Sequence, residues 1–589
     1  MSDSCSKRCS SGRARLIVAG LLALFTICSS PSAFAQMARL VGSVTDPSGA
    51  IIPSATVVAT NVATRISTRA VTNGAGQYVI PDLVPGDYSI TGEKTGFVKK
   101  TITGIVLQVG QMGEIDFSLE LGAVTQTVQV TGHPPLLDHV SSDLGQVIDR
   151  QQVATLPLNG RNFMQLALLT AGVSEGVSAD WTGVQMYSAN GLTGENNNYI
   201  MDGISNRESA SNTVIESPSV DAIQEFKAET GMFSAEHQAA GMVINVVTKS
   251  GTNQIHGAAY DYLRNDALDA SGFFPTSDRV KPPLRRNQFG GAAGGRFVRD
   301  KDFWFASYEG QRQSQGSVLI GLVPTAQQIS GQFDTTITDP LTGEPFPSTD
   351  GVTQLPADRI SPVLQTILSY YPGPNISQYG ANYINTESAT VNYNSFLIKT
   401  DHYLTDKDSV SVRFSYKNLN QFQPGGLPIL DGDFQVDNTR GLSIGYHHTF
   451  SSNLLNELRL GYTRWLLNGV PEAAGTKYAV NPGILGIGLP VGATNPLSLP
   501  YNLYPSGYVS IQPVAAGGNA LIIQVMNDFE VGDTLTWVRG SHSIKAGGLV
   551  YRSQFKSFGL GTIETGGGAI RDNSLVILLL TPCSITLFR

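Results

Sequence analysis

AGMVINVVTKSGTNQIHGAAYDY, residues 240–262, contains a change of pattern that decides the fold. From Met242 to Val247 the chain is almost continuously apolar, which is typical of a strand covered on both faces. After the turn at 250–253 one face carries Gly257, Ala259 and Asp261, and the other carries Ala258, Tyr260 and Tyr262. The chain therefore leaves a buried strand and enters one whose two faces meet different surroundings.

The composition favours a mainly β protein with several domains. A chain of 589 residues is too long for one core. Only 15% of the residues are charged and 63 are glycine, which suits short strands separated by turns. The net charge of −8, with no basic run beyond the first fifteen residues, argues against a nucleic-acid partner.

Residues 1–35 predict a cleaved signal peptide. Basic residues precede an apolar run of thirteen residues, 16–28, and Ala33-Phe34-Ala35 supplies the cleavage site before Gln36. The run is shorter than the ~20 residues that a spanning helix needs. Three of the four cysteines leave with this segment, so Cys583 has no intrachain partner and the mature chain must be held by sheet pairing.

Residues 36–122 predict a small β-sandwich, because turn clusters recur every 8–15 residues. The pattern GxVxDxxGxxIPxAxV at 42–57, followed by PGDYSI at 85–90, resembles the carboxypeptidase regulatory-like domain, a transthyretin-like sandwich. The resemblance implies no peptidase activity. It does allow carbohydrate binding, for which Tyr78 and Tyr88 are stacking candidates, although we favour core or turn aromatics at both positions.

Residues 123–253 predict a mixed α/β domain. LPLNGRNFMQLALLTAGV, 156–173, has helical spacing, and NNNYIMDGIS, 196–205, contains a short strand that ends in Asp202-Gly203. SPSVDAIQEFKAETG, 217–231, predicts a helix capped by Ser219 and then a strand that stops at Gly231. The apolar side of that helix would be Val220, Ile223 and Phe226.

The order of these blocks resembles the plug domain of TonB-dependent outer-membrane receptors. The matching pieces are the Asp202-Gly203 turn, the acidic start at 221–225 and the glycine and VINVVTK strand at 241–249. Together with LPLNGRNF and the leading sandwich, they point to the Oar-like branch of that family. Ala189-Asn190-Gly191 stands where the family usually has an arginine–glycine pair.

From residue 254 the pattern indicates strands of an outer-membrane barrel. SVSVRFSY, 409–416, and NELRLGYTR, 456–464, alternate apolar and polar side chains. Short turns at 405–408 and 451–453 separate adjacent strands, whereas the long stretches 314–392 and 465–527 follow every second one. That asymmetry is typical of an outer-membrane barrel.

The barrel is expected to be incomplete. About nine strands are recognisable between 255 and 555, whereas the resemblance implies twenty-two, and an open sheet in lipid leaves backbone groups unpaired. The end also loses its alternation at 575–580, and Arg589 follows the aromatic Phe588. We therefore expect 254–589 to form a partial antiparallel transmembrane β-barrel, the chain to be an N-terminal part of a receptor, and this part to be unable to transport alone.

No motif for catalysis, for a cofactor or for a metal is present. The eight histidines are scattered, and His447 and His448 are adjacent in a strand and point to opposite faces. We predict no enzyme activity, no cofactor and no metal site. Asp202 and Asp221 are candidate substrate ligands at the plug, with a turn aspartate and a helix-start acid as the favoured alternatives.

The resemblance implies a receptor that takes up an external ligand when periplasmic TonB pulls on the plug. The segment Thr125-Gln126-Thr127-Val128-Gln129-Val130 resembles the family's TonB box, a strand that pairs with a sheet edge of TonB. A linker or a last sandwich strand is an equal alternative for this segment. The expected location is the outer membrane of a Gram-negative-type cell, in contact with lipid and with the sandwich in the periplasm. The alternative function is an anchored adhesion or carbohydrate-binding protein.

Overall fold

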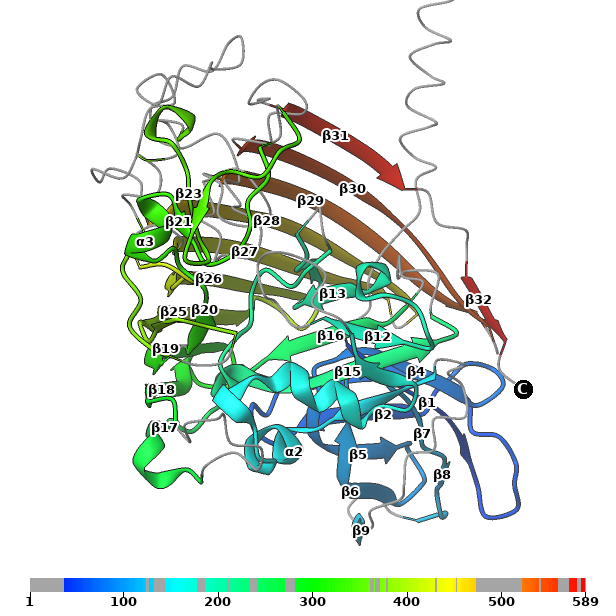
Figure 1. The fold of residues 1–589 in the computed structure, drawn as a ribbon. Helices are drawn as coiled ribbons and strands as arrows, with labels where there is room; N and C mark the ends of the chain where they lie inside the picture. Colours follow the sequence, from blue (N-terminus) through cyan, green and yellow to red (C-terminus); the bar gives the residue numbers. More distant parts are fainter. Residues whose placement is uncertain are drawn as a thin grey trace, which may run out of the picture.

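The computed structural model shows a curved sheet, the wall, with two smaller domains against it (Figure 1). The central domain, called the plug, lies on the concave side of the wall, and the sandwich lies beyond it. The structure describes residues 37–122, 127–131, 144–176, 186–208, 212–233, 241–270, 281–316, 318–339, 342–360, 365, 371–377, 380–428, 432–451, 453–472, 522–539, 542–559, 571–579 and 584–587. The predicted signal peptide, with Ala35 and Gln36, lies outside these ranges.

The sandwich consists of two sheets that enclose an apolar core. Its strands are β1 Ala38–Thr45, β2 Thr56–Asn61, β3 Ser67–Val71, β4 Gln77–Leu83, β5 Gly86–Glu93, β6 Lys99–Leu107, β7 Met112–Glu114, β8 Phe117–Ser118 and β9 Thr127–Thr131. One sheet has the order β4-β1-β7, with β8 also on β1, and the other has the order β3-β2-β5-β6-β9. Leu40, Ile80, Ile90 and Phe117 are almost completely buried between the sheets.

Tyr78 and Tyr88 belong to this core. Only 2% of Tyr78 and 3% of Tyr88 is exposed. The Tyr78 hydroxyl donates to the Ile115 carbonyl (2.6 Å), and the Tyr88 hydroxyl donates to the Val84 carbonyl (2.9 Å). The favoured interpretation of core aromatics is therefore confirmed, and neither ring is available to stack on a sugar.

The plug is built on a sheet with the order β10-β15-β16-β13-β14. Its elements are β10 Leu144–Ile148, α2 Arg150–Thr155, η1 Asn159–Arg161, η2 Phe163–Leu169, β11 Val173–Glu175, β12 Tyr187–Ala189, η3 Gly194–Asn196, β13 Asn198–Met201, β14 Ile204–Ser205, η4 Val220–Ala222, β15 Ile223–Gly231 and β16 Val243–Thr248. Every residue of β16 is buried, as its apolar run predicts. The core includes an edge-to-face contact between Phe163 and Phe226, with ring centroids 5.3 Å apart.

The predicted helix after Ser219 was wrong. Only a single 3-10 turn, η4, forms there, and β15 already begins at Ile223. The Ser219 side chain makes no capping hydrogen bond. Pairing of β15 with both β10 and β16 gives this segment more backbone hydrogen bonds than a short helix would, so the sheet overrides the local helical spacing.

The wall is one antiparallel sheet of eleven strands within the described residues. The order is β17 to β19, then β25 to β31 in sequence, with β32 also on β30. These strands are β17 His256–Asn265, β18 Leu284–Val298, β19 Asp302–Gly316, β25 Ser388–Tyr403, β26 Asp408–Gln423, β27 Asp433–Ser451, β28 Leu454–Pro471, β29 Ile522–Arg539, β30 His542–Gly559, β31 Arg571–Leu579 and β32 Ser584–Leu587. The nine strands expected from the sequence lie within these strands, at about 256–264, 288–298, 303–313, 393–402, 409–417, 440–450, 455–464, 528–538 and 543–553.

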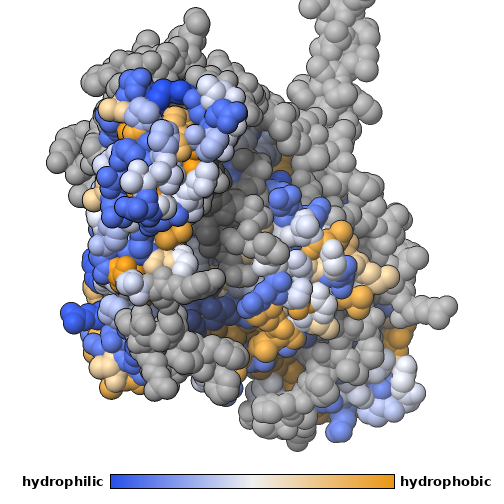
Figure 2. Space-filling view, in the orientation of Figure 1, coloured by the Kyte–Doolittle hydropathy of each residue, from blue (hydrophilic) through white to orange (hydrophobic). Residues whose placement is uncertain are grey.

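Small elements fill the long segment between β19 and β25. They are β20 Leu319–Gly321, α3 Ala326–Ile329, β21 Gln332–Phe333, β22 Ser348–Thr349, β23 Val352–Gln354, η6 Ala357–Arg359 and β24 Tyr383–Asn385. The turn η5 Asp266–Leu268 follows β17. In Figure 2 hydrophilic residues are frequent over this segment, at the upper left of the molecule. This surface is the polar end of the wall that carries the long connections.

The two faces of the wall differ as the alternation predicts. Many polar side chains on the concave face are almost completely buried, and six of them are at most 7% exposed: Arg413, Ser415, Glu457, Arg459, Thr534 and Thr536. Large apolar side chains on the convex face are exposed, and six of them are 39–45% exposed: Phe414, Leu460, Phe529, Val531, Leu535 and Val550. The plug therefore covers a polar surface, and the outer surface is suited to lipid.

The wall is an open sheet in the part of the chain that the structure describes. β17 forms one edge, and β31 and β32 lie at the other (Figure 1). This arrangement agrees with the prediction of an incomplete barrel. Among the described helices, none has the length and apolar character needed to cross a membrane.

Candidate functional site at the seam between plug and wall

The Asp202-Gly203 turn fixes the plug sheet at the interface between plug and wall, which we call the seam. Both residues have positive φ, 46° and 81°, as in the two-residue hairpin that joins β13 to β14. The Asp202 carboxylate accepts the Thr248 N–H at Oδ1 (3.0 Å) and the Thr248 hydroxyl at Oδ2 (2.6 Å). The turn aspartate therefore holds the end of β16, which confirms the structural interpretation of this residue.

Two cations of the wall meet the same carboxylate. Lys399 Nζ lies 3.1 Å from Asp202 Oδ1, and Arg413 Nε lies 3.5 Å from Oδ2. Lys399 also donates to the Thr248 carbonyl (3.2 Å). Burial alone would raise the pKa of Asp202, but Lys399, Arg413 and the Thr248 hydrogen bonds together lower it below its ordinary value. Asp202 is therefore an anion between two wall cations.

Arg161 makes the opposite connection, from a plug cation to a wall anion. It lies in the LNGRN turn with a φ of 53°. Its guanidinium pairs with Asp221 and with Glu309 of β19, 3.4 Å away. It also lies over the rings of Tyr260 and Tyr262, 4.4 and 4.7 Å from their centroids. The aromatic face of β17 thus points to the plug.

Glu309 is the centre of a hydrogen-bond network on the wall. Tyr260 donates its hydroxyl to Glu309 Oε2 (2.7 Å), and Tyr393 donates to Oε1 (2.7 Å). Gln288 adds a bond from its side-chain amide to Oε1 (3.1 Å). With Arg161 opposite, the buried carboxylate has the donors that a buried charge needs.

A third connection seats the β13–β14 hairpin. The Ser205 N–H donates to Glu530 Oε2 of β29 (3.0 Å). A Cβ on Gly203 would lie 2.6 Å from Arg459 Nη1, so a larger residue here would displace the Arg459 side chain. Arg459 itself pairs with Glu457 on β28. The wall therefore contacts both sides of the turn that carries Asp202.

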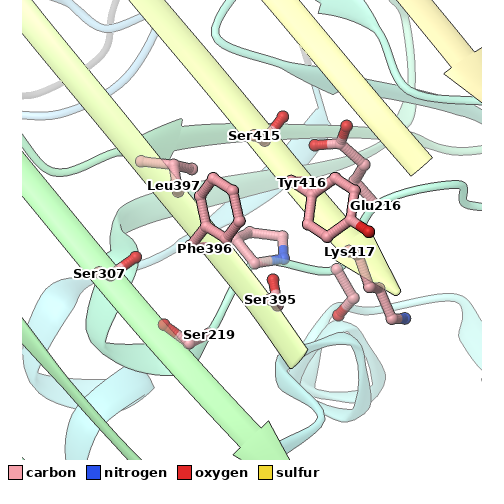
Figure 3. A pocket seen from close by; sticks show the side chains of 11 residues that line it. Glu216, Ser219, Ser307, Ser395, Phe396, Leu397, Ser415, Tyr416 and Lys417 are labelled. Carbon is pink, nitrogen blue, oxygen red and sulfur yellow. The ribbon is translucent and has the colours of Figure 1, made fainter. Parts of the chain in front are cut away.

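A small pocket of mixed lining lies along the seam beside these contacts, with Phe396, Leu397 and Tyr416 among its wall residues. Figure 3 shows Glu216 and Ser219 of the plug and Ser307, Ser395 and Ser415 of the wall around it. Within the described residues, Glu216 Oε1 and the Ser219 hydroxyl are buried and have no hydrogen-bond partner. Ordered water commonly satisfies buried groups of this kind. The seam thus combines polar groups with apolar contacts, such as that of Ile215 of the plug with Trp465 of the wall.

The contacts of the seam are of a kind that holds two domains together. Paired charges and hydrogen bonds join the plug to the wall, and no group of three histidine, cysteine, aspartate or glutamate residues with metal-binding geometry occurs among the described residues. Asp221, a candidate substrate ligand, is paired with Arg161. Sequence patterns did not identify four residues of the seam: Arg161, Lys399, Arg413 and Glu309. Each is a charged residue on a strand face or turn that is otherwise small or polar. Such a charge indicates that an oppositely charged partner exists, but it does not identify the partner.

The candidate TonB box is only partly described. Thr127, Val128, Gln129 and Val130 belong to β9, which pairs in parallel with β6 from Lys99↔Thr127 onward. Thr125 and Gln126 lie outside the described residues. The described part of the segment thus forms the last strand of a sandwich sheet, one of its two predicted alternatives, and its role as a TonB box stays a prediction.

Two domain families match the chain. Residues 247–571, more than half of the chain, match the family described as outer membrane beta barrel domain. Residues 39–120 match the carboxypeptidase regulatory-like domain. The TonB-dependent transporter Oar of Myxococcus xanthus is 30% identical over 311 residues, which are 50% of this chain and 28% of that protein. The chain thus spans less than a third of the length of this relative.

Two solved structures of outer-membrane proteins are among those similar to this chain. The outer membrane transporter YddB from Escherichia coli is 11% identical, with a TM-score of 0.43, and the match covers 74% of this chain and 53% of that one. The siderophore receptor PirA from Acinetobacter baumannii is 14% identical, with a TM-score of 0.41, and covers 71% and 49%. From the family matches, the chain belongs to the outer-membrane β-barrel family, lies in the outer membrane, and is a homologue of the TonB-dependent transporter Oar that carries a carboxypeptidase regulatory-like domain.

Proposed function

We propose that the protein takes up an external ligand through the outer membrane, with the plug closing the path along the wall until periplasmic TonB pulls on it. The observation that supports this proposal is the set of ion pairs between plug and wall at the seam. The plug rests on the polar face of the wall through paired charges, Asp202 with Lys399 and Arg413, and Arg161 with Glu309. Such contacts hold a plug in place, yet they can be exchanged for water when it moves.

The sandwich is proposed to lie in the periplasm. Its β2–β3 turn is joined to the β18–β19 turn of the wall by Asn253 of the β16–β17 linker, whose side-chain amide donates to both Asp300 and the Thr64 carbonyl. The β18–β19 turn is one of the short connections of the wall, and short turns face the periplasm in outer-membrane barrels. The long segment between β19 and β25 would then face outward, where ligands arrive.

β9 is proposed to be the strand that TonB binds. It is the terminal strand of the order β3-β2-β5-β6-β9, so among the described residues only one of its edges is paired. The other edge can accept a strand from a partner by β-augmentation. The strand also precedes the plug in the chain, so that a pull on it is transmitted to β10.

A proline in β9 tests this assignment. Val128→Pro removes a backbone N–H from the strand and is expected to weaken binding of the TonB periplasmic domain by about tenfold or more. Surface plasmon resonance with the immobilised chain measures this affinity. Val128→Thr keeps the backbone donor and should bind like the parent chain. Equal affinities of the two variants for TonB would contradict the assignment.

Deletion of residues 124–130 tests the transport function in cells. Energised uptake should be lost because the pull no longer reaches the plug, whereas binding of the ligand at the cell surface should remain. The comparison uses the full-length protein with and without the deletion, and its readout is accumulation of the nutrient on which growth depends. Unchanged uptake after the deletion would refute the role of this segment.

A further inference from the structure

Two loops of the sandwich project from the domain and contact the rest of the molecule. The loop between β6 and β7, residues 108–111, contacts strand β15 of the plug. The turn between β2 and β3, residues 62–66, contacts Asn253, which lies in the linker between β16 and β17. Neither contact belongs to the charge pairs of the seam.

The first contact buries a carboxylate of the plug. Val109 is completely buried, and its N–H donates to Glu225 Oε1. Only 5% of Glu225 is exposed. Gly110 follows with a φ of +67°, and a Cβ on it would lie 4.0 Å from Lys227 Nζ. The loop therefore lies directly over the charged side of β15.

The second contact connects the sandwich to the wall through one side chain. The Asn253 N–H donates to the Ala63 carbonyl (3.1 Å), and its side-chain amide donates to the Thr64 carbonyl. The same amide donates to Asp300 Oδ1 (2.7 Å), and the Asp300 N–H donates back to Asn253 Oδ1 (2.9 Å). Asn253 thus joins the sandwich turn to the β18–β19 turn of the wall.

The sandwich turn is stiff enough to carry this contact. Asn61 Oδ1 accepts the N–H groups of both Ala63 and Thr64, each at 3.0 Å. Arg65 has a φ of 63° and donates its N–H to the Asn61 carbonyl (2.8 Å). The turn is therefore closed by its own hydrogen bonds, and the carbonyl groups of Ala63 and Thr64 are left to accept from Asn253.

We propose that the sandwich is a clamp that fastens the plug to the wall. It holds the plug at Glu225 and the wall through Asn253, and both contacts start from one rigid β-sandwich. The plug can therefore shift along the wall only after one of the two contacts has opened. This role concerns the resting position of the plug and does not depend on which ligand is taken up.

The buried carboxylate makes the first contact sensitive to pH. Burial raises the pKa of Glu225 to about 7, the Val109 N–H opposes the shift and Asp149 adds to it. A pKa raised above its ordinary value of 4.5 means that the contact is complete below about pH 4.5 and weakens as the pH rises through 7. Lys227 and Glu229 of the same strand are paired at 2.9 Å, Asp149 is the charge that raises the pKa further, and residues 108–111 carry no charge.

The pH dependence can be measured at the loop itself. A cysteine at Val109 should react with a maleimide faster at pH 8 than at pH 5, relative to a cysteine at the exposed Ser48. Glu225→Gln removes the titrating group, so the relative rate should then be the same at both values. A relative rate that depends on pH equally in both chains would exclude Glu225 as the cause.

The clamp is tested by labelling at two places in the full chain held in detergent micelles. In a Cys583→Ser background, Val109→Cys reports docking of the sandwich, and Ser307→Cys, 8% exposed at the seam, reports docking of the plug. The double variant Glu225→Ala/Asn253→Ala should label at least about tenfold faster at both cysteines. Asn73→Ala is the matched control, because Asn73 bonds only within a sandwich turn, to Ala75 and Gln77.

The two reporters separate the possible outcomes. Faster labelling at both positions, relative to Asn73→Ala, supports the clamp. Faster labelling at Val109→Cys alone would mean that the sandwich leaves without loosening the plug, which overturns the proposal. Unchanged rates at both positions would mean that the two contacts do not hold the sandwich, and that result overturns it as well.

Discussion

Replacing Asp202 by asparagine is expected to destabilise docking of the plug by about 3–5 kcal/mol, because it leaves Lys399 and Arg413 buried without their counter-charge. Asparagine accepts the positive φ of this turn, so the backbone should keep its conformation and only the charge is removed. Trp465 is a suitable reporter, since it packs against Ile215 of the plug. In a chain whose other tryptophans are phenylalanine, the urea midpoint of its emission should fall.

The matched control is Asp46→Asn. Asp46 is also a turn aspartate, but its carboxylate accepts from Ser48 and Ala50 within its own turn. Its replacement should leave the Trp465 transition within about 1 kcal/mol of the parent chain. A similar midpoint for the two variants would show that the buried ion pairs contribute nothing to docking.

The lowered pKa of Asp202 gives this prediction a pH dependence of known sign. Because the folded value lies below 3.8, the stabilisation is fully present above that pH and is lost as the pH falls through the folded value. The parent chain should therefore lose more stability in acid than Asp202→Asn does. Urea titrations at pH 7 and at about pH 3 measure the difference.

Much of the fold could be predicted because side-chain periodicity has a direct geometric meaning. The run from Met242 to Val247 became a strand buried on both faces, and SVSVRFSY became a wall strand with Arg413 inside and Phe414 outside. A period of two fixes which face a residue occupies. The turn at Asp202-Gly203 could also be predicted from its own two residues, because both residue types favour positive φ.

The partners across the seam could not be predicted in the same way. Asp202 and Lys399 are 197 residues apart in the chain, and no local pattern relates them. The face occupied by Arg413 was predictable, but its counter-charge depends on where the plug rests along the wall. The failed helix after Ser219 has the same origin, because β15 forms only when β10 and β16 are both in place.

Replacing Arg161 by methionine should have the second largest effect, about 3 kcal/mol, because it leaves the Glu309 carboxylate buried without a cation. The stacking of the guanidinium on Tyr260 and Tyr262 is lost at the same time. Methionine fills a similar volume, so the packing changes little. Hydrogen exchange read by mass spectrometry should show amides of η2 exchanging roughly a hundredfold faster.

Arg264→Met is the control at the same seam. Arg264 pairs with Asp269 and donates to Asn159, but 44% of its side chain is exposed, so its loss should change exchange in η2 by less than about fivefold. Arg161→Lys should lie between the two, because an ammonium keeps the charge but cannot pair with Asp221 and Glu309 while stacking on two rings. Of these two arginines, Arg161 is the one that neutralises a buried carboxylate of the wall. Equal exchange rates for Arg161→Met and Arg264→Met would therefore contradict the role of the Arg161–Glu309 pair.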